Sequence, residues 1–528
     1  MLLPTLTIGA IGLVVCIHAY IYQSYKHYTR SKSMGCLPPT VLYSDPLGIY
    51  DFWYINKAVK EKRWLEYITS KHELHRNTFQ FAMFYKSIIC TIEPTNVKAI
   101  LATKFEDFSL GCRHEQFSPF LGSGIFTLDG EPWAHARGLL RPQFTREQVF
   151  QKKALRSQKA KINLQVADID ILDHHVTRII ESVPKGRSSF DIQPLCFSFA
   201  LNSATHFLFG ESVDSLDPRL FQASAAASVQ GFEEAFDLAQ DYLFARSRAV
   251  GLYWLINPKA FRDATRTVHE VVNYYVRRAI DMRQNGGQRD KAKGRYIFLE
   301  ALAAETQDPK ILRDNLLNIL LAGRDTTSSL LSSTFYYLAR NPRVWHKLRD
   351  QIVSYFGTNS KPLAELTQTS LKAIPYLRYV LNEVLRLLPP IPINFRIATK
   401  GTCLPVGGGP DGKSPVYVPK GAMIFYSVYS MHRRTDIWGQ DAHSFRPERW
   451  ENAKHQWEYL PFNGGPRICL GQQYALTVAS YALVRFMQHF DVLENPNPDS
   501  TDNPVLRANL TLSHDQGVMV RLYSSSRA

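Results

Sequence analysis

The sequence predicts a mainly α-helical fold with a smaller β region, preceded by one N-terminal membrane-spanning helix. Long segments from the middle of the chain onward repeat apolar residues at helical spacing. Alternation of apolar and polar residues, typical of strands, is confined to a few short segments. The chain also begins with an apolar run of bilayer length. With 45% hydrophobic and 21% charged residues, its composition is that of a folded globular protein.

The N-terminal apolar run covers residues 2–22 and contains one ionisable residue, His18. As a helix it spans roughly 30 Å, about the thickness of a bilayer core. A cleaved signal peptide is the alternative, but no Lys or Arg precedes the run, which is also long for a signal peptide. Basic residues follow it before the first acidic residue, which favours a cytosolic location for this flank. We therefore expect an anchor over 1–24, a basic, proline-containing linker over 25–40 and one cytosolic catalytic domain over 41–528.

Helical spacing extends over four long segments, which are residues 262–283, 311–338, 341–355 and 371–388. Strand-like alternation covers residues 79–91, 415–432 and 518–523. The polar, glycine-containing run 283–295 is expected to be a solvated loop.

The stretch "GGGPDGKS", residues 407–414, matches the pattern of a phosphate-binding loop. Such a loop must open a helix, whose N-terminus holds the phosphates. Here Pro415 and a strand-like alternation follow instead. We therefore expect a β-hairpin and no nucleotide site.

Composition excludes several other classes of protein. The seven cysteines are scattered and show no C-x-x-C spacing, which excludes a disulfide framework and a zinc finger and fits a reducing compartment. The formal net charge of +15 suits an acidic partner or anionic lipid headgroups. The basic residues are dispersed and form no aromatic-interleaved module, so we expect no nucleic-acid partner.

The stretch "PFNGGPRICLG", residues 461–471, surrounds one cysteine with glycines. An inert buried thiol is the ordinary explanation of a single cysteine. At Cys469, however, the preceding glycines let the backbone approach a bulky planar group, and Gly471 opens the next helix. Free backbone N–H groups and the helix end would stabilise a thiolate here. Arg467 offers a fork of donors for a carboxylate such as a heme propionate.

The pattern F-x-x-G-x-R-x-C-x-G is filled by Phe462, Gly465, Arg467, Cys469 and Gly471. It resembles the heme-binding signature of the cytochrome P-450 superfamily, the heme-thiolate monooxygenases. The resemblance implies heme b as cofactor, with its iron bound by the axial thiolate of Cys469. It also implies the cytochrome P-450 fold, in which the heme lies between a long central helix and the cysteine loop.

A second motif, "AGRDTT", interrupts an apolar helical segment. In a plain core helix, Thr326 would bond back to a carbonyl one turn earlier. Gly323 lowers the helix propensity, which favours a local opening of the helix. The resemblance implies an oxygen-activating groove beside the heme, lined by Ala322, in which Asp325 and Thr326 deliver protons. Such delivery needs a short, positioned relay in a dry pocket.

Two further motifs complete the resemblance. Glu383 and Arg386 share a helix face, and Arg449 matches the arginine that completes the family's structural Glu-Arg-Arg network. Trp133 and Arg137 also share a helix face, and the family's corresponding residues contact the heme propionates. A further arginine, Arg396, matches another propionate ligand of the family.

Residues 111–149 and 402–416 look particularly similar to fungal microsomal enzymes that hydroxylate n-alkanes and fatty acids, often at the terminal carbon. By match to the family's substrate-recognition regions, the pocket residues are Phe117, Phe120, Ile125, Ala322, Ile391, Ile393 and Leu512. This apolar set suits a hydrocarbon chain but equally a polyketide or terpenoid. A tailoring monooxygenase of fungal secondary metabolism therefore remains an alternative.

The resemblance implies that electrons come from NADPH through a separate NADPH–cytochrome reductase, with cytochrome b5 as a second candidate donor. It also implies a single-pass protein of the endoplasmic reticulum membrane. A heme-thiolate isomerase or dehydratase and a heme sensor are the alternative classes. The intact Asp325–Thr326 pair counts against the isomerase.

Overall fold

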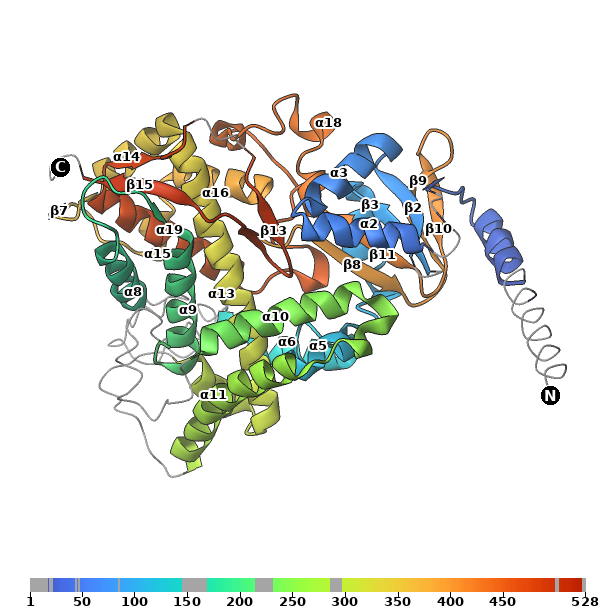
Figure 1. Cartoon of the computed structure of the whole chain (residues 1–528), viewed down its shortest axis with the longest axis horizontal. Coiled ribbons are helices and arrows are strands. Elements are labelled where there is room, and N and C mark those ends of the chain that lie inside the picture. Colours follow the sequence, from blue (N-terminus) through green and yellow to red (C-terminus); the bar gives the residue numbers. More distant parts are fainter. Residues whose placement is uncertain are drawn as a thin grey trace, which may run out of the picture. The chain divides into compact units, whose positions relative to one another are not determined.

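The computed structural model describes residues 18, 22–42, 45, 48–83, 86–144, 169–213, 231–284, 297–498 and 503–524. The chain divides into two compact units (Figure 1). Unit 1 combines Met1–Ser109, Ile393–Met431 and Gly464–Arg467, and unit 2 combines Leu110–Pro392, His432–Asn463 and Ile468–Ala528. Both units are built from separated chain segments, so no composition change along the sequence marked this division. The predicted boundaries of one catalytic domain over 41–528 did not anticipate it.

Unit 1 contains a mixed sheet whose strands follow the order β1, β2, β3, β11, β8, β4. Their bounds are Thr40–Val41, Thr78–Met83, Lys86–Thr91, Met423–Ser427, Ile393–Ala398 and Phe108–Ser109. The antiparallel pair β2–β3 confirms the strands predicted over 79–91. Strand β11 pairs parallel to β3 and antiparallel to β8. The helices of unit 1 include α2 (Ile49–Lys60), α3 (Trp64–His75) and α4 (Pro94–Lys98), which leads into a π-helical turn over Ala99–Thr103.

The predicted hairpin is confirmed. Strands β9 (Thr402–Gly408) and β10 (Ser414–Val418) pair antiparallel, and the Gly407 N–H donates to the Gly412 carbonyl at 2.8 Å. The stretch that matches a phosphate-binding loop therefore joins two strands.

One strand prediction extends too far. The segment expected over 415–432 ends with β11, after which Val428–Met431 form helix α17. The Ser427 hydroxyl accepts the Ser430 N–H at 3.0 Å, so its side chain satisfies a donor of the new helix and stops the strand.

Unit 2 is mainly helical and centres on α13 (Pro309–Arg340), drawn in yellow in Figure 1. Asp308 caps this helix by accepting the Lys310 and Ile311 N–H groups at 2.8 and 3.2 Å. Helix α13 contacts α9, α11 and α19. The helices of unit 2 are α5 (Arg113–Leu121), α6 (Gly130–Phe144), α8 (Ile169–Glu181), α9 (Gln193–Phe209), α10 (Phe232–Arg248), α11 (Lys259–Gln284), α12 (Phe298–Glu305), α13, α14 (Pro342–Phe356), α15 (Gln368–Leu371), α16 (Pro375–Leu387), α18 (Thr435–Trp438) and α19 (Gln472–His489).

Three of the four long predicted helices are confirmed as α11, α13 and α14. The fourth, expected over 371–388, is confirmed as α16, but it begins four residues later than predicted, at Pro375, and Leu371 ends the separate short helix α15. A residue before proline avoids the helical region, and Ile374 is accordingly extended.

Small sheets complete unit 2. Strand β15 (Met519–Tyr523) confirms the predicted C-terminal strand and pairs with β12 (Val492–Glu494) and β5 (Phe190–Asp191). Two hairpins are formed by β13 (Leu506–Ala508) with β14 (Leu512–His514), and by β6 (Gly357–Thr358) with β7 (Lys361–Pro362). A mainly helical protein with small sheet regions is thus observed.

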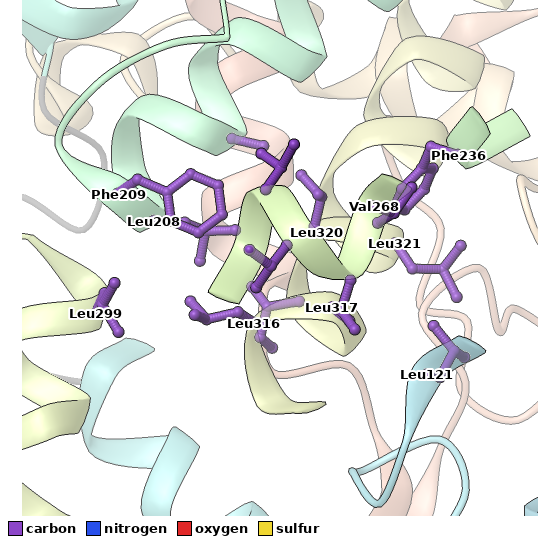
Figure 2. Close-up of a cluster of buried hydrophobic side chains, with 14 of the residues drawn as sticks. Leu121, Leu208, Phe209, Phe236, Val268, Leu299, Leu316, Leu317, Leu320 and Leu321 are labelled. Carbon is purple, nitrogen blue, oxygen red and sulfur yellow. The ribbon is translucent and has the colours of Figure 1, made fainter. Parts of the chain in front are cut away.

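A large apolar cluster forms the core of unit 2 around the first half of α13. Figure 2 shows its leucines, with Leu208 and Phe209 on one side and Phe236 and Val268 on another. Each fully buried side chain of this size contributes about 1.5–3 kcal/mol. The cluster therefore anchors α13 against α9, α10 and α11.

Two predicted segments fall mostly outside the described residues. Of the anchor expected over 1–24, the structure describes His18 and residues 22–24. Among the described residues, no helix is both long and apolar enough to span a bilayer. Residues 22–33 are helical, so part of the predicted linker is a helix. Of the loop expected over 283–295, residues 283 and 284 belong to α11 and the rest lies outside the described residues.

Candidate functional site

Cys469 sits immediately before α19, held by a tight backbone loop. Its N–H donates to the Phe462 carbonyl at 3.0 Å, which closes the loop. Within this loop Asn463 adopts a φ of 61°, a left-handed conformation that asparagine tolerates better than most residues. The Gly471 carbonyl accepts the Ala475 N–H at 2.9 Å as α19 begins. The loop thus fixes where the cysteine side chain leaves the backbone.

Burial raises the pKa of the Cys469 thiol, and two neighbouring groups lower it. The side chain is exposed, yet nearby protein desolvates the sulfur, and this burial raises the pKa of the thiol. A hydrogen bond from the Gly471 backbone N–H and the charge of Arg137 lower that pKa but do not cancel the rise. A bound metal ion would shift the balance decisively, because a coordinating thiol is deprotonated outright.

Trp133 and Arg137 lie beside this loop. Both residues are on α6, and the guanidinium carbon of Arg137 is 5.9 Å from the centre of the Trp133 ring. Arg137 Nη2 donates to the Ile468 carbonyl at 2.9 Å. The helix face predicted from the sequence therefore brings a cation next to Cys469 and holds the Trp133 indole against that cation.

Arg396 and Arg467 belong to unit 1. Arg396, on β8, is buried, and its Nη1 donates to the Phe395 carbonyl at 2.7 Å. Its Nε is a buried donor that finds no hydrogen-bond partner within the described part of the chain. The guanidinium carbon of Arg467 lies 6.0 Å from the Phe105 ring centre. A buried, unsatisfied donor costs free energy unless an acceptor binds it, so Arg396 suits an anionic ligand group.

Glycine is required at position 465, where the backbone passes close to the Leu101 carbonyl of the same unit. Its φ is 67°, and a Cβ added there would lie 1.9 Å from the Leu101 carbonyl oxygen. Only glycine fits both conditions.

Asp325 is part of a buried charge cluster that the sequence did not reveal. Arg324 is 1% exposed, and its Nη1 lies 3.0 Å from Asp325 Oδ1. The same guanidinium binds Asp237 and, at 2.8 Å, Glu233 Oε1, both on α10. Burial raises the pKa of Asp325 to about 6, although the charge of Arg324 opposes the rise. Arg324 therefore joins α13 to the two α10 carboxylates.

The predicted opening of α13 at Gly323 is wrong in this structure. Helix α13 continues without a break from Pro309 to Arg340. Thr326 Oγ1 donates to the Ala322 carbonyl at 2.6 Å, so the hydroxyl is satisfied along the intact helix. A Cβ at Gly323 would meet only Ala204 Cβ, at 3.7 Å, so packing does not force the helix apart there.

The Glu-Arg-Arg network is assembled around the fully buried Glu383. Glu383 accepts hydrogen bonds from Arg386 Nη2 and Arg449 Nε, each at 2.8 Å. Sequence reasoning missed two further donors, the Trp450 indole N–H at 2.9 Å and the Arg446 backbone N–H at 3.0 Å. A buried carboxylate with this many donors stabilises local geometry.

The predicted pocket residues fall into separate groups. Phe117 and Phe120 are buried on α5 in the apolar cluster, and Ile125 packs against it. Leu512, on β14, is buried, and its N–H donates to the Pro390 carbonyl, next to Ile391, at 2.9 Å. Ile393 belongs to β8 of unit 1.

The sequence profile of the family described as Cytochrome P450 matches residues 45–518. The chain belongs to the cytochrome P450 family. This P450 is similar to cytochrome P450 52A12 of Debaryomyces hansenii, with 45% identity over 97% of this chain and 96% of that protein. It is also similar to cytochrome P450 52A5 of Candida maltosa, with 48% identity over 97% and 96% of the two chains. Cytochrome P450 52E1 of Candida apicola shares 41% identity over 97% and 98%.

The chain is therefore a P450 monooxygenase, an enzyme class that uses a heme-thiolate centre, a reductase and a hydrophobic substrate. Its residues fit such a cofactor in two ways. The Cys469 sulfur is accessible and receives a backbone N–H, and Arg396 keeps a buried donor for a carboxylate. Among the described residues, no group of three or more His, Cys, Asp or Glu side chains is placed to hold a metal ion.

Proposed function

We propose that this P450 hydroxylates long hydrophobic chains, namely n-alkanes or fatty acids, with the terminal carbon as the first candidate position. The observation that carries the proposal is the similarity to cytochromes P450 52A12, 52A5 and 52E1 along nearly the whole chain. Nothing in these relatives favours a role in secondary metabolism, which we do not propose.

A binding and turnover screen tests the substrate class. The heme-loaded protein is titrated with a homologous series of n-alkanes and fatty acids, and with a polyketide and a terpenoid of similar size. We expect substrate-induced spectral shifts that strengthen with chain length, followed by hydroxylated product when reductase, NADPH and oxygen are added. Shifts and product with the polyketide or terpenoid alone would contradict the proposal.

We propose that Cys469 is the axial thiolate ligand of heme b. Phe462, Gly471 and Ala322 are the apolar and backbone contacts that the resemblance assigns to the cofactor. Trp133, Arg137, Arg396 and Arg467 are its propionate ligands by the same argument. When bound, the heme supplies the oxidation of a C–H bond by dioxygen and two electrons.

We propose that Asp325 and Thr326 deliver protons. A carboxyl with a pKa of about 6 takes up and releases a proton close to neutral pH, as a relay requires. Asp325 is linked to Asp237 and Glu233 through Arg324, whose guanidinium stays protonated, so Arg324 positions the Asp325 carboxyl. The Thr326 hydroxyl must rotate from the Ala322 carbonyl to donate elsewhere.

Thr326→Ala is expected to separate electron consumption from product formation. Without the hydroxyl, protons reach the wrong place, and we expect product per NADPH to fall by up to about 100-fold while peroxide rises. Thr326→Ser keeps the hydroxyl and is the matched control. The measurement is product, peroxide and NADPH in the same reaction, and unchanged coupling in Thr326→Ala would contradict the role.

The ratio of product to NADPH is expected to fall as the pH rises through about 6. Below that pH Asp325 is protonated and can donate, whereas above it the carboxylate predominates. Asp325→Asn cannot ionise and should lose this inflection. The charge of Arg324 lowers the pKa of Asp325. Arg324→Met removes this charge and should therefore move the inflection to higher pH. An inflection near 6 that survives in Asp325→Asn would exclude Asp325 as its source.

We propose an anchor over 1–24, a linker over 25–40 and a catalytic domain over 41–528, located at the endoplasmic reticulum membrane and facing the cytosol. The family profile begins at residue 45, beyond the anchor. On helix 22–33, Tyr22, Tyr25 and Tyr28 are exposed at a spacing of three, which suits a membrane interface. An NADPH–cytochrome reductase, and cytochrome b5 as a second donor, would meet the cytosolic face. Protease protection of an epitope placed after residue 528 in microsomes would contradict this topology.

A further inference from the structure

A cluster of two cysteines and one lysine lies in unit 1, outside the groups described above. Lys104 Nζ is 2.9 Å from Cys403 Sγ and 2.8 Å from the Cys403 carbonyl oxygen. Cys36 lies close enough to the Cys403 side chain for that side chain to raise the pKa of the Cys36 thiol, while Cys36 Sγ donates to the Met34 carbonyl oxygen at 3.7 Å. Residues far apart in sequence therefore bring two thiols and an ammonium group together.

Backbone contacts hold the cluster in place. The Leu37 N–H donates to the Pro415 carbonyl at 2.9 Å, and the Gly409 N–H donates to the Pro38 carbonyl at 3.0 Å. A Cβ added to Gly408 would lie 2.4 Å from the Leu37 carbonyl oxygen, so the two backbones approach closely. The segment that carries Cys36 is thus tied, through Leu37 and Pro38 directly after it, to the β9–β10 hairpin that carries Cys403.

The two sulfurs differ in environment. Cys36 is buried, and desolvation raises the pKa of its thiol to about 11, so it stays protonated at neutral pH. Cys403 is only half-buried, and its sulfur accepts a hydrogen bond from the Lys104 ammonium group. Cys403 is the less buried of the two sulfurs and has the Lys104 ammonium against it, so it is the sulfur better placed to meet an oxidant.

We propose that Cys403 and Cys36 form a peroxide-sensitive dithiol that closes to a disulfide, with Lys104 as the group that activates Cys403. The Cys403 thiolate attacks one oxygen of hydrogen peroxide, the O–O bond breaks, and Cys403 sulfenic acid and hydroxide form. The Cys36 thiol then attacks the Cys403 sulfur, its proton passes to the departing hydroxyl, and water leaves. The hydroxide takes up the proton that Cys403 released on forming the thiolate, so the net reaction consumes one hydrogen peroxide and two thiols and gives one disulfide and two waters. The product joins the segment after helix 22–33 covalently to β9, and cellular thiols reverse it.

The test uses the full-length, heme-loaded protein in detergent, with added hydrogen peroxide. Remaining thiols are alkylated, and the protein is digested without reductant and analysed by mass spectrometry. We expect a Cys36–Cys403 peptide, two thiols lost per protein, and full reversal by dithiothreitol, with the heme absorbance unchanged. Cys112→Ser is the matched control and should behave as wild type, whereas Cys36→Ser should stop at a Cys403 sulfenic acid that a dimedone probe traps.

Lys104 variants separate activation from proximity alone. Lys104→Met is expected to slow oxidation about tenfold, and Lys104→Arg to retain most of the rate, because the charge persists. Equal rates in wild type and Lys104→Met would overturn the role of Lys104. Oxidation of Cys112 before Cys403, or a Cys403 product joined to Lys104 instead of Cys36, would overturn the proposal itself.

Discussion

Cys469→Ser is expected to abolish both monooxygenase turnover and the Soret band that marks a thiolate-ligated, carbon-monoxide-bound ferrous heme. A serine hydroxyl keeps the shape of the side chain but supplies neither the charge nor the electron donation of a thiolate. The backbone that positions the residue, including the Cys469 N–H bond to the Phe462 carbonyl, does not depend on the side chain. The loop should therefore persist while its chemistry is lost.

Three measurements make this result decisive. Heme content is determined after chemical release of the cofactor, the reduced carbon-monoxide complex is scanned, and product formation is measured with reductase and NADPH. Cys112→Ser, at a half-buried cysteine, serves as the control and should retain band and activity. A folded, heme-loaded Cys469→Ser protein with the wild-type band would show that another group is the ligand.

The sequence predicted best where the interacting residues are near one another in the chain. Trp133 and Arg137 are four residues apart, and one turn of helix brings them together. Glu383 and Arg386 are three apart, and the same periodicity brings them together. Strand alternation after Pro415 likewise indicated that the glycine-rich stretch is the loop of a hairpin, which β9 and β10 confirm.

Prediction failed where distant segments decide the structure. Arg324 binds Glu233 and Asp237, roughly ninety positions earlier in the sequence, and no periodicity links residues so far apart. An arginine inside an apolar helix was the available signal that acidic partners should exist. The opening of α13 was predicted from the propensity of Gly323, yet contacts along the whole helix outweigh a local cost of about 1 kcal/mol.

The division into two units also escaped the sequence, for a related physical reason. Residues 393–431 and 464–467 join unit 1 through strand pairing and backbone contact, such as the approach of Gly465 to the Leu101 carbonyl. Such pairing leaves no mark on composition, which is what linker prediction uses. The same long-range convergence placed Cys36 and Cys403 together although 366 residues separate them.

Glu383→Leu is expected to cause the largest loss of stability of any single change considered. Glu383 is completely buried and accepts hydrogen bonds from Arg386, Arg449 and the Trp450 indole. Removing it leaves two buried guanidinium groups without their shared counter-ion. Breaking a buried pair in this way costs about 3–5 kcal/mol, enough to erase much of the stability of a typical domain.

An exposed pair of the same spacing provides the comparison. Arg266 and Asp263 are also three residues apart, with side chains 67% and 41% exposed, so Asp263→Ala should cost about 1 kcal/mol or less. The measurement is a urea titration of both variants. The loss of helical circular dichroism and the loss of heme absorbance are followed together. The penalty comes from uncompensated charge. The double variant Glu383→Leu with Arg386→Met should therefore lose less free energy of unfolding than the sum of the losses in the two single variants. Equal stability of Glu383→Leu and Asp263→Ala would mean that the buried carboxylate does not hold this region of the enzyme together.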